Sequence, residues 1–283
     1  MVVLFGVYFS NDYDGTSNYN LTSIASLVSL NGFDALGYSP SVTPSSRSAF
    51  LSDFTFRQQP FSVVFFVKGR SRYDFEKRMG NLLNAFRQFE AFTPANRFIF
   101  TNQTNNSIFE VPVIVEDVYV QEQSGFSATV TVTGLRRTQG VFVGDMFTPI
   151  ETTTSTSGLP KNVSISYPHS FPAPIRLTLV GPIAAGFSIR RTENLPLYDF
   201  TLTVGESIPS GEIVLIDYLT HPLEGLLPTY NIHYLSNPEI ASSLVIRPPS
   251  VNGNTTNTFR LSGTSSAGIV RFEVYPMAWS IYE

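Results

Sequence analysis

Two groups of acidic residues are the first candidates for chemistry in this 283-residue chain. Glu116 and Asp117 are adjacent, whereas the two carboxylates of a glycoside hydrolase must face one another across a cleft. Neighbouring side chains on a strand point to opposite faces, so this pair does not form such a site. Asp12 and Asp14 precede Gly15 as in a calcium loop, but a third acidic ligand and a closing glutamate are missing. An Asp-Gly turn explains these residues better.

Motifs for nucleotide binding, nucleophilic catalysis and metal binding are also missing. The nearest approach to a phosphate-binding loop, Gly263-Thr-Ser-Ser-Ala-Gly268, has no following lysine and fits a hairpin loop better. The chain has no cysteine, which excludes disulfides, thiolate ligands and cysteine nucleophiles. Its three histidines, His169, His221 and His233, are too scattered for a recognisable zinc motif. We therefore expect no catalytic, cofactor-binding or metal-binding residues, no cofactor and no enzyme activity.

The composition points to a protein that is covered by other subunits. Only 14% of the residues are charged, against about 25% in a typical soluble chain, while the chain has 24 Phe and 13 Tyr. The net charge of −4 and the absence of a Lys/Arg run argue against nucleic-acid binding. The adjacent pairs Arg136-Arg137 and Arg190-Arg191 are expected at solvated strand ends. Apolar stretches such as Phe61–Val67 are too short to cross a membrane, and no leader is evident at the N-terminus, so we expect a soluble protein made inside the cell.

The chain is expected to form two domains. The segment ETTTSTSGLPKN, which ends at Asn162, contains almost no large apolar residue and therefore indicates a linker or a long exposed loop. We assign residues 1–150 to a first domain, residues 151–165 to the linker and residues 166–283 to a second domain.

The first domain is expected to be rich in strands. Val2–Phe9 and Phe61–Val67 have the β-branched and aromatic residues of buried strands, and the segment from Phe126 alternates as a strand with one solvated face does. Pro112 interrupts the apolar segment 108–120, which favours an edge strand or a bulged strand. A hairpin turn is expected over Gln121–Gly125.

A single long amphipathic helix is predicted over Arg72–Phe92. Six apolar residues at spacings of three and four form one face: Phe75, Met79, Leu82, Leu83, Phe86 and Phe89. Ser71 followed by Asp74 resembles a capping box, and Pro94 would stop the helix. We expect the apolar face to pack on the sheet, with a membrane-binding or partner-binding helix as the alternative.

Residues 31–60 differ from both patterns. The segment carries several Pro and Gly residues and has no steady period, which predicts a long irregular stretch. Its three phenylalanines, Phe50, Phe54 and Phe56, argue against full solvation. We expect this segment to form part of a subunit interface.

The second domain is expected to be an antiparallel β-sandwich without helices. Gly, Pro and Asn separate short apolar runs at the spacing typical of two packed sheets. The expected strands are 175–180, 187–191, 198–204, 212–218, 243–247, 258–261, 269–274 and 278–282. Trp279, the single tryptophan, is the obvious residue for sugar stacking, but the alternation of Met277, Trp279 and Ile281 favours a side chain that faces the core.

The arrangement resembles the distal tail proteins of bacteriophages with long non-contractile tails. In the second domain the similar segments are Gly186-Phe-Ser-Ile-Arg-Arg followed by Asn194, Ile208-Pro-Ser-Gly-Glu-Ile-Val-Leu-Ile-Asp217, Phe259-Arg-Leu-Ser-Gly263 and Val270-Arg-Phe-Glu-Val274. In the first domain, strand 61–67 followed by the helix matches the order of that family. The sequence departs from the family where Gly263–Gly268 replaces its usual Pro-Gly-Asn turn and where the region 221–238 is longer.

The resemblance implies a mainly β fold, in which an N-terminal sheet domain with one helix precedes a galectin-like β-sandwich. It also implies a structural virion protein of the tail tip or baseplate, assembled in the host cytoplasm, whose N-terminal domains close head-to-tail into a hexameric ring around a channel for DNA. The implied partners are the tail tube protein, a tail-associated tip protein, and receptor-binding or adaptor proteins docked on the outer domains during host attachment. No specific nucleic-acid binding and no membrane insertion are expected.

Two other classes of protein remain open from the sequence alone. A carbohydrate-binding adhesin or receptor-binding protein would present an exposed aromatic residue, Trp279, Tyr230 or Tyr234, among polar side chains. A glycoside or peptidoglycan hydrolase with a dispersed site would bring two carboxylates together in one cleft.

Overall fold

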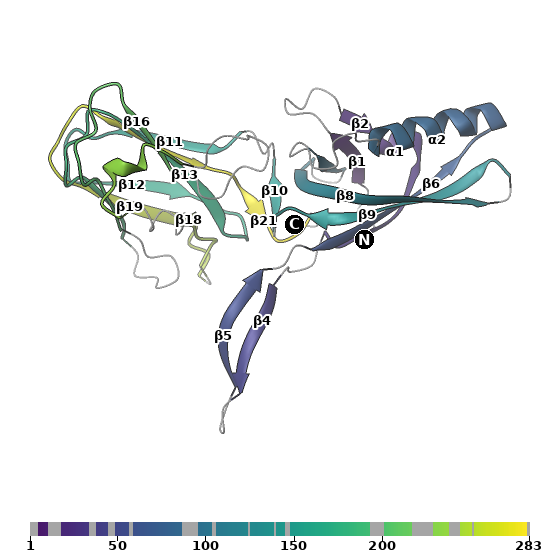
Figure 1. Ribbon diagram of the computed structural model, residues 1–283, viewed down its shortest axis with the longest axis horizontal. Helices are drawn as coiled ribbons and strands as arrows, with labels where there is room; N and C mark the ends of the chain where they lie inside the picture. The colour runs from purple at the N-terminus through teal and green to yellow at the C-terminus, as the bar shows by residue number, and fades with distance from the viewer. Residues whose placement is uncertain are drawn as a thin grey trace. The chain divides into compact units, whose positions relative to one another are not determined.

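The computed structural model describes residues 5–10, 18–33, 38–44, 49–56, 59–86, 96–103, 106–123, 125–138, 140–144, 148–192, 201–216, 229–237, 244–250 and 252–281. The fold is mainly β, as expected (Figure 1). The chain divides into two compact units, Met1–Gly144 with Trp279–Glu283 and Asp145–Ala278. No helix among the described residues is long and apolar enough to cross a membrane.

The first unit is built on a single large antiparallel sheet with the spatial order β2-β1-β7-β8-β9-β6-β3. Its strands are β1 (Phe5–Ser10), β2 (Asn18–Asn20), β3 (Ser26–Asn31), β6 (Pro60–Lys68), β7 (Arg97–Asn102), β8 (Ile108–Gln123) and β9 (Ser127–Arg136). A further strand, β10 (Val141–Val143), pairs with β8. Side chains of β9 alternate between half-buried and buried along its whole length, which confirms the sheet with one solvated face that the sequence predicts.

Strand β8 is bulged, and only its first part lies between two other strands. Its first part, up to Pro112, pairs with β7, and its second part, from Val113 onward, pairs with β9. The predicted edge strand is therefore wrong for the first part, which lies between β7 and β10. The predicted bulge is confirmed between Val115 and Asp117. Pro112 has no N–H to donate and lies where the pairing partner changes, while its carbonyl accepts a hydrogen bond from Arg137 at 2.9 Å.

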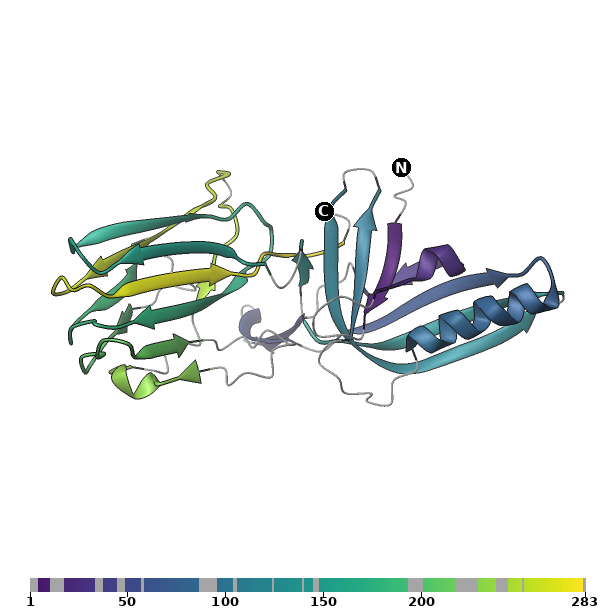
Figure 2. The same cartoon turned by 90° about the horizontal axis from the view of Figure 1, so that it is seen from above.

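The predicted helix is confirmed as α2 (Arg72–Phe86); the rest of the expected helix, with Phe89 and Pro94, lies outside the described residues. A second, four-residue helix, α1 (Leu21–Ile24), was not anticipated. Figures 1 and 2 show α2 running along the sheet. Its buried residues, Met79, Leu82, Ala85 and Phe86, lie on the face that the periodicity predicts.

Phenylalanine rings fill the space between α2 and the sheet. The Phe98 ring centroid lies 5.1 to 6.1 Å from those of five other rings: Phe9, Phe33, Phe61, Phe86 and Phe100. These rings come from β1, β6, β7, α2 and the segment after β3, so one cluster joins elements that are far apart in sequence. Packing of this kind adds ring–ring attraction to the burial of apolar area.

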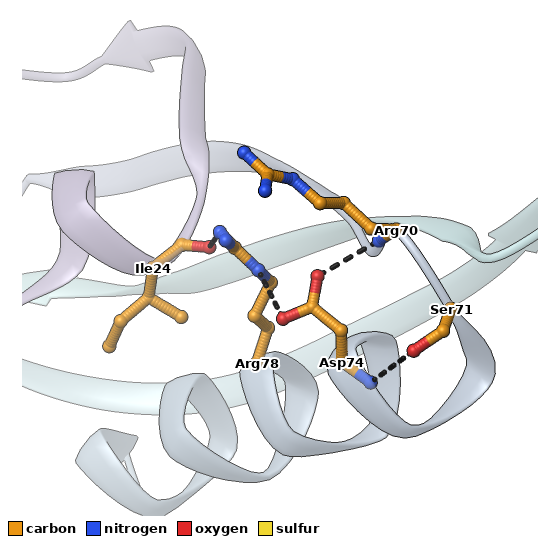
Figure 3. Close-up of polar contacts among 5 residues, drawn as sticks. All are labelled: Ile24, Arg70, Ser71, Asp74 and Arg78. Carbon is orange, nitrogen blue, oxygen red and sulfur yellow. Dashed lines mark hydrogen bonds and ion pairs between the residues drawn. The ribbon is translucent and has the colours of Figure 1, made fainter.

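Asp74 organises the start of α2 (Figure 3). Ser71 Oγ accepts a hydrogen bond from the Asp74 backbone N–H at 3.2 Å, which confirms the predicted cap. The Asp74 carboxylate accepts hydrogen bonds from the Arg70 backbone N–H at 2.9 Å and from Arg78 Nε at 3.2 Å. Arg78 also donates to the Ile24 carbonyl at 3.2 Å, which connects α2 to α1. The Arg70 hydrogen bond, followed by that of Arg78, lowers the pKa of Asp74.

The expectation of an irregular stretch over residues 31–60 is wrong. β4 (Tyr38–Pro44) and β5 (Ala49–Phe56) form an antiparallel hairpin whose register shifts between Ser41 and Val42. Pro40 and Pro44 lie within β4, where they remove two backbone donors, so the sequence shows a poor strand signal although the backbone is extended. Among the described strands, β4 and β5 pair only with one another.

The second unit is a two-sheet antiparallel sandwich. One sheet has the order β11-β20-β13-β16-β17, with β18 beside β13, and the other has the order β12-β19-β14-β15. The strands are β11 (Ile150–Ser155), β12 (Lys161–Ser166), β13 (Ala173–Val180), β14 (Ser188–Arg191), β15 (Thr201–Thr203), β16 (Ile213–Ile216), β17 (Thr229–Tyr230), β18 (Val245–Ile246), β19 (Thr256–Ser262) and β20 (Ile269–Val274). Phe259 of β19 stacks on Phe272 of β20 across the core, with ring centroids 5.2 Å apart.

Several expected boundaries differ from the structure. Residues 151–165, expected to be a linker, lie largely in β11 and β12, because Thr-rich sequence suits an exposed strand that pairs with β20. The expected strand 278–282 is wrong: β21 (Met277–Ala278) ends before Trp279, which is half-buried and does not face the core fully. A short 3-10 helix, η1 (Ile232–Tyr234), interrupts a unit expected to have no helix.

The expectation that both arginine pairs lie at solvated strand ends is wrong. Arg136 and Arg191 are 0% and 1% exposed, because adjacent residues on a strand point to opposite faces and one of each pair turns inward. Arg136 donates to the Gly32 carbonyl at 3.0 Å. Arg191 donates to Asn257 Oδ1 at 2.7 Å, and its guanidinium lies 5.0 Å from the Phe259 ring centroid. Such partners offset the cost of burying a charge.

Truncating the centre of the phenylalanine cluster should destabilise the first unit strongly. We expect Phe98→Ala to lower the free energy of unfolding by about 3–5 kcal/mol, because it removes apolar contact and leaves a cavity. Urea unfolding followed by the fluorescence of Trp279, which belongs to the first unit, measures this loss. Tyr73→Ala, at a position of α2 that is 76% exposed, is the control and should change the value by less than about 0.5 kcal/mol. A loss below about 1 kcal/mol for Phe98→Ala would contradict a central role for the cluster.

The Asp74 contacts should make stability depend on pH. Because folding lowers the pKa of Asp74, its contribution is complete above the ordinary value of 3.8 and disappears as the pH falls below it. We expect wild type to be more stable than Asp74→Asn at pH 7 and the difference to shrink as the pH falls from 3.8 through the lower pKa of the folded state. Urea midpoints of both proteins across this range test the expectation, with Glu116→Gln, which changes an exposed acid of the same unit, as the control. A difference that persists unchanged in acid would show that the charge of Asp74 is unimportant.

Candidate interaction surfaces

The residues singled out for chemistry are dispersed in the structure. The described residues contain no group of three or more His, Asp or Glu side chains placed to hold a metal ion. The His169 ring lies beside Tyr167, with centroids 5.3 Å apart, and the His233 ring lies beside Tyr234, with centroids 4.2 Å apart. His221, Asp12 and Asp14 lie outside the described residues.

The remaining motifs have structural explanations. Glu116 is the extra residue of the β8 bulge, and both it and Asp117 are exposed. Asp117 accepts a hydrogen bond from the Val118 backbone N–H at 2.8 Å. The segment Gly263–Gly268 joins β19 of one sheet to β20 of the other, so the predicted hairpin loop is wrong. The hydroxyls of Ser266 and Thr156 lie 2.7 Å apart within the same unit.

The sheet of the first unit leaves one face without a helix, and two neighbouring rows of this open face are uncharged, with Lys68 and Asp117 in the rows on either side. Since α2 packs against Phe65, the alternate side chains of β6 point to the opposite side. Two cross-strand rows of the open face can be followed through the register: Ser26, Phe66, Thr129 and Gln121, and Ser29, Val64, Thr131 and Tyr119. Neither row carries a charge, and Tyr119 is 59% exposed. A surface with aromatic residues and few charges is typical of the centre of a protein interface.

Two strand edges in the first unit offer backbone hydrogen bonds. Beyond Val113, β9 is the only partner strand of β8 among the described residues, so the other edge of β8 is open. The β4–β5 hairpin likewise has no third strand among them. Open edges are templates for pairing with another chain, and the bulge with Glu116 and Asp117 limits such pairing on β8.

The second unit presents aromatic and aliphatic side chains near the end of one sheet. Tyr230 is 53% exposed and lies opposite Leu215 in the register, while Ile213 is 43% exposed. Asn231 donates hydrogen bonds to Glu212 at 3.2 Å and to the Ile213 carbonyl at 2.9 Å, so polar groups flank the tyrosine. Of the three residues proposed for sugar stacking, Tyr230 is the most exposed, while Tyr234 and Trp279 are half-buried.

Sequence reasoning did not identify the exposed Ile213 and Ile269. The signal is present in the alternation, because Val214 and Val270 point into the core and their neighbours must point outward. Apolar residues on both sides of a strand hide this alternation. The sequence also gave no indication that Arg190 and Arg260 are direct neighbours, because only the strand register brings them together.

Comparison with known proteins finds similarity in structure alone. No family model matches the sequence, and no curated protein matches it significantly. The crystal structure of SPP1 Dit (gp 19.1), described as a paradigm of the hub adsorption apparatus in phages that infect Gram-positive bacteria, matches with a TM-score of 0.56 and 11% identity. The match covers 95% of this chain and 98% of that one.

Two structures of the phage p2 baseplate in its activated conformation, one with Sr and one with Ca, match at TM-scores of 0.45 and 0.42. They are 8% and 9% identical and cover 93% of this chain and 99% of theirs. The chain therefore has the fold of SPP1 Dit over nearly its whole length, which confirms, for the fold, the resemblance to phage distal tail proteins.

Proposed function

We propose that this protein is a structural component of a phage tail tip, where it forms the hub at the distal end of the tail. The observation that carries the proposal is the match to SPP1 Dit, which extends over 95% of this chain and 98% of that one and so includes both units.

In this proposal six copies of the first unit close head-to-tail into a ring. A ring of this kind uses two different patches on each subunit, so it covers surface twice per copy. The open face around Tyr119, the edge of β8 and the β4–β5 hairpin are the candidate patches. The two uncharged rows of the open face suit burial between subunits, and the absence of a Lys/Arg run suits a channel through which DNA slides without being held.

The second unit would then dock the outer components of the tail. The proposed partners are a receptor-binding or adaptor protein on the sandwich and the tail tube and tail-associated proteins on the two sides of the ring. Exposed Ile213, Tyr230 and Ile269 would contribute apolar anchors to such contacts. The proposed location is the virion, after assembly in the host cytoplasm.

A second candidate function is direct glycan binding by the sandwich. It is favoured by the exposed ring of Tyr230 beside Asn231 and Glu212, because sugars stack on aromatic rings while polar neighbours bind their hydroxyls. Loss of neutral-glycan binding in Tyr230→Ala would support this role, and an unchanged response would exclude Tyr230 from it.

Native mass spectrometry of the full chain, with negative-stain images of the same sample, tests the ring. We expect a species of about 190 kDa, six times the chain mass of 31.3 kDa, with an open centre. A chain that stays monomeric at every concentration, also with the tail tube protein added, would contradict the proposal.

Deleting residues 40–50 tests the hairpin as an interface element. The deletion removes most of β4 and the start of β5, so we expect a ring-forming chain to become monomeric or to form smaller species. Size-exclusion chromatography with light scattering measures the assembly, and the Trp279 urea midpoint verifies that the first unit remains folded. A hexamer of unchanged stability from the deletion variant would remove the hairpin from the interface.

A further inference from the structure

The four-stranded sheet of the second unit has an outer face of unusual composition. Its inward side chains, among them Val163, Ile189 and Phe259, are buried. The outward side chains, which we call the polar face, are almost all uncharged and hydrogen-bonding: Asn162, Ser164, Ser166, Ser188, Arg190, Thr201, Thr203, Thr256, Thr258, Arg260 and Ser262. Strands β12 and β19, which contribute more than half of this face, lie side by side in Figure 1.

The only two charges of the polar face are arginines placed against one another. Arg260 pairs in register with Asn162 on one side and with Arg190 on the other, so the two guanidinium groups share a face on adjacent strands. Both residues are exposed, and neither has an ion-pair partner among the described residues. By contrast, the exposed Arg271 of the other sheet contacts Glu151 at 3.2 Å.

Like charges directly opposite one another destabilise a sheet. The arrangement is therefore unfavourable in the free protein and becomes favourable when an anion lies between or over the two guanidinium groups. Arginine is suited to this task, since its planar group donates paired hydrogen bonds to a carboxylate or a phosphate.

A hollow lies next to the arginine pair. It has a volume of about 300 Å³ and is lined by Pro160, Lys161, Asn162 and Arg260. This volume is at the lower end of the range for ligand sites, which suits one sugar ring or one anionic group of a longer chain. Lys161 adds a third positive charge at the rim, where its ammonium group donates to the Ser157 carbonyl at 3.3 Å.

The composition of the face distinguishes between kinds of anionic ligand. None of the large exposed apolar residues of the described chain lies on it, whereas protein interfaces depend on aromatic and apolar anchors. Hydroxyl and amide groups around the two arginines instead match a ligand with many hydroxyls. We propose that the polar face binds an anionic polysaccharide, with Arg190 and Arg260 holding its carboxylate or phosphate groups.

This site does not depend on the formation of a ring and would be present in a single chain. Its test is therefore separate from the mass measurement of the hub, and either can fail while the other succeeds.

Biolayer interferometry of the full chain against immobilised polysaccharides tests the proposal. The probes are polygalacturonate for carboxylates, poly(glycerol phosphate) for phosphates and dextran as a neutral chain. We expect at least one anionic probe to bind and dextran to bind at least tenfold more weakly, with affinity falling as salt rises. The double variant Arg190→Ser and Arg260→Ser should lose at least tenfold in affinity for the bound probe.

The matched control is Arg271→Ser, which removes an exposed arginine from the opposite sheet of the same unit and should leave binding unchanged. Because relief of the like-charge contact should leave the double variant at least as stable as wild type, thermal unfolding separates loss of binding from loss of folding.

Absence of binding to both anionic probes, or an equal loss of affinity in Arg271→Ser, would overturn the site. Equally tight binding of poly-glutamate, with the same sensitivity to the double variant, would overturn the assignment to a polysaccharide.

Discussion

Burial of phenylalanine rings between α2 and one face of the large sheet is the interaction on which the first unit depends. The Phe98 ring contacts rings from four other parts of the chain, so the cluster fixes where α2, β1, β6 and the segment after β3 lie. Only one face of the sheet is covered in this way. The other face carries no helix, and Tyr119 there is 59% exposed.

The second unit, like the first, buries charge as well as apolar area. Arg191 enters the sandwich over the Phe259 ring and donates to Asn257. Asn257 in turn exchanges hydrogen bonds with the backbone of Arg247, at 3.0 and 3.1 Å. Removing one partner from such a buried network lowers the free energy of unfolding by more than a single surface contact contributes to it. The reason is that the remaining polar groups would be buried without a hydrogen-bond partner and without access to water. This network therefore fixes how β14, β18 and β19 meet.

The surfaces that remain have different characters, and each favours a different kind of contact. The open face of the first unit and its strand edges suit copies of the same protein, since they combine apolar area with unpaired backbone groups. The exposed Ile213, Tyr230 and Ile269 suit a protein partner, whereas the arginine pair in its polar surroundings suits an anionic chain of sugars.

The sequence by itself determined the local features that depend on neighbours along the chain. The period of α2, its Ser71 cap and the alternation of β9 were predictable because each needs only a few consecutive residues. The hairpin turn between β8 and β9 was expected from Gln121, whereas β8 extends to Gln123. The mainly β class followed from the same patterns. Tertiary structure decided the rest: that β4 and β5 pair despite their prolines, that Ile150–Ser155 joins a sheet, that Arg136 and Arg191 turn inward, and that Arg190 meets Arg260. These features depend on which strands lie side by side in the fold. Strand register brings together residues that are far apart in sequence, and no pattern of neighbouring residues reveals such a contact.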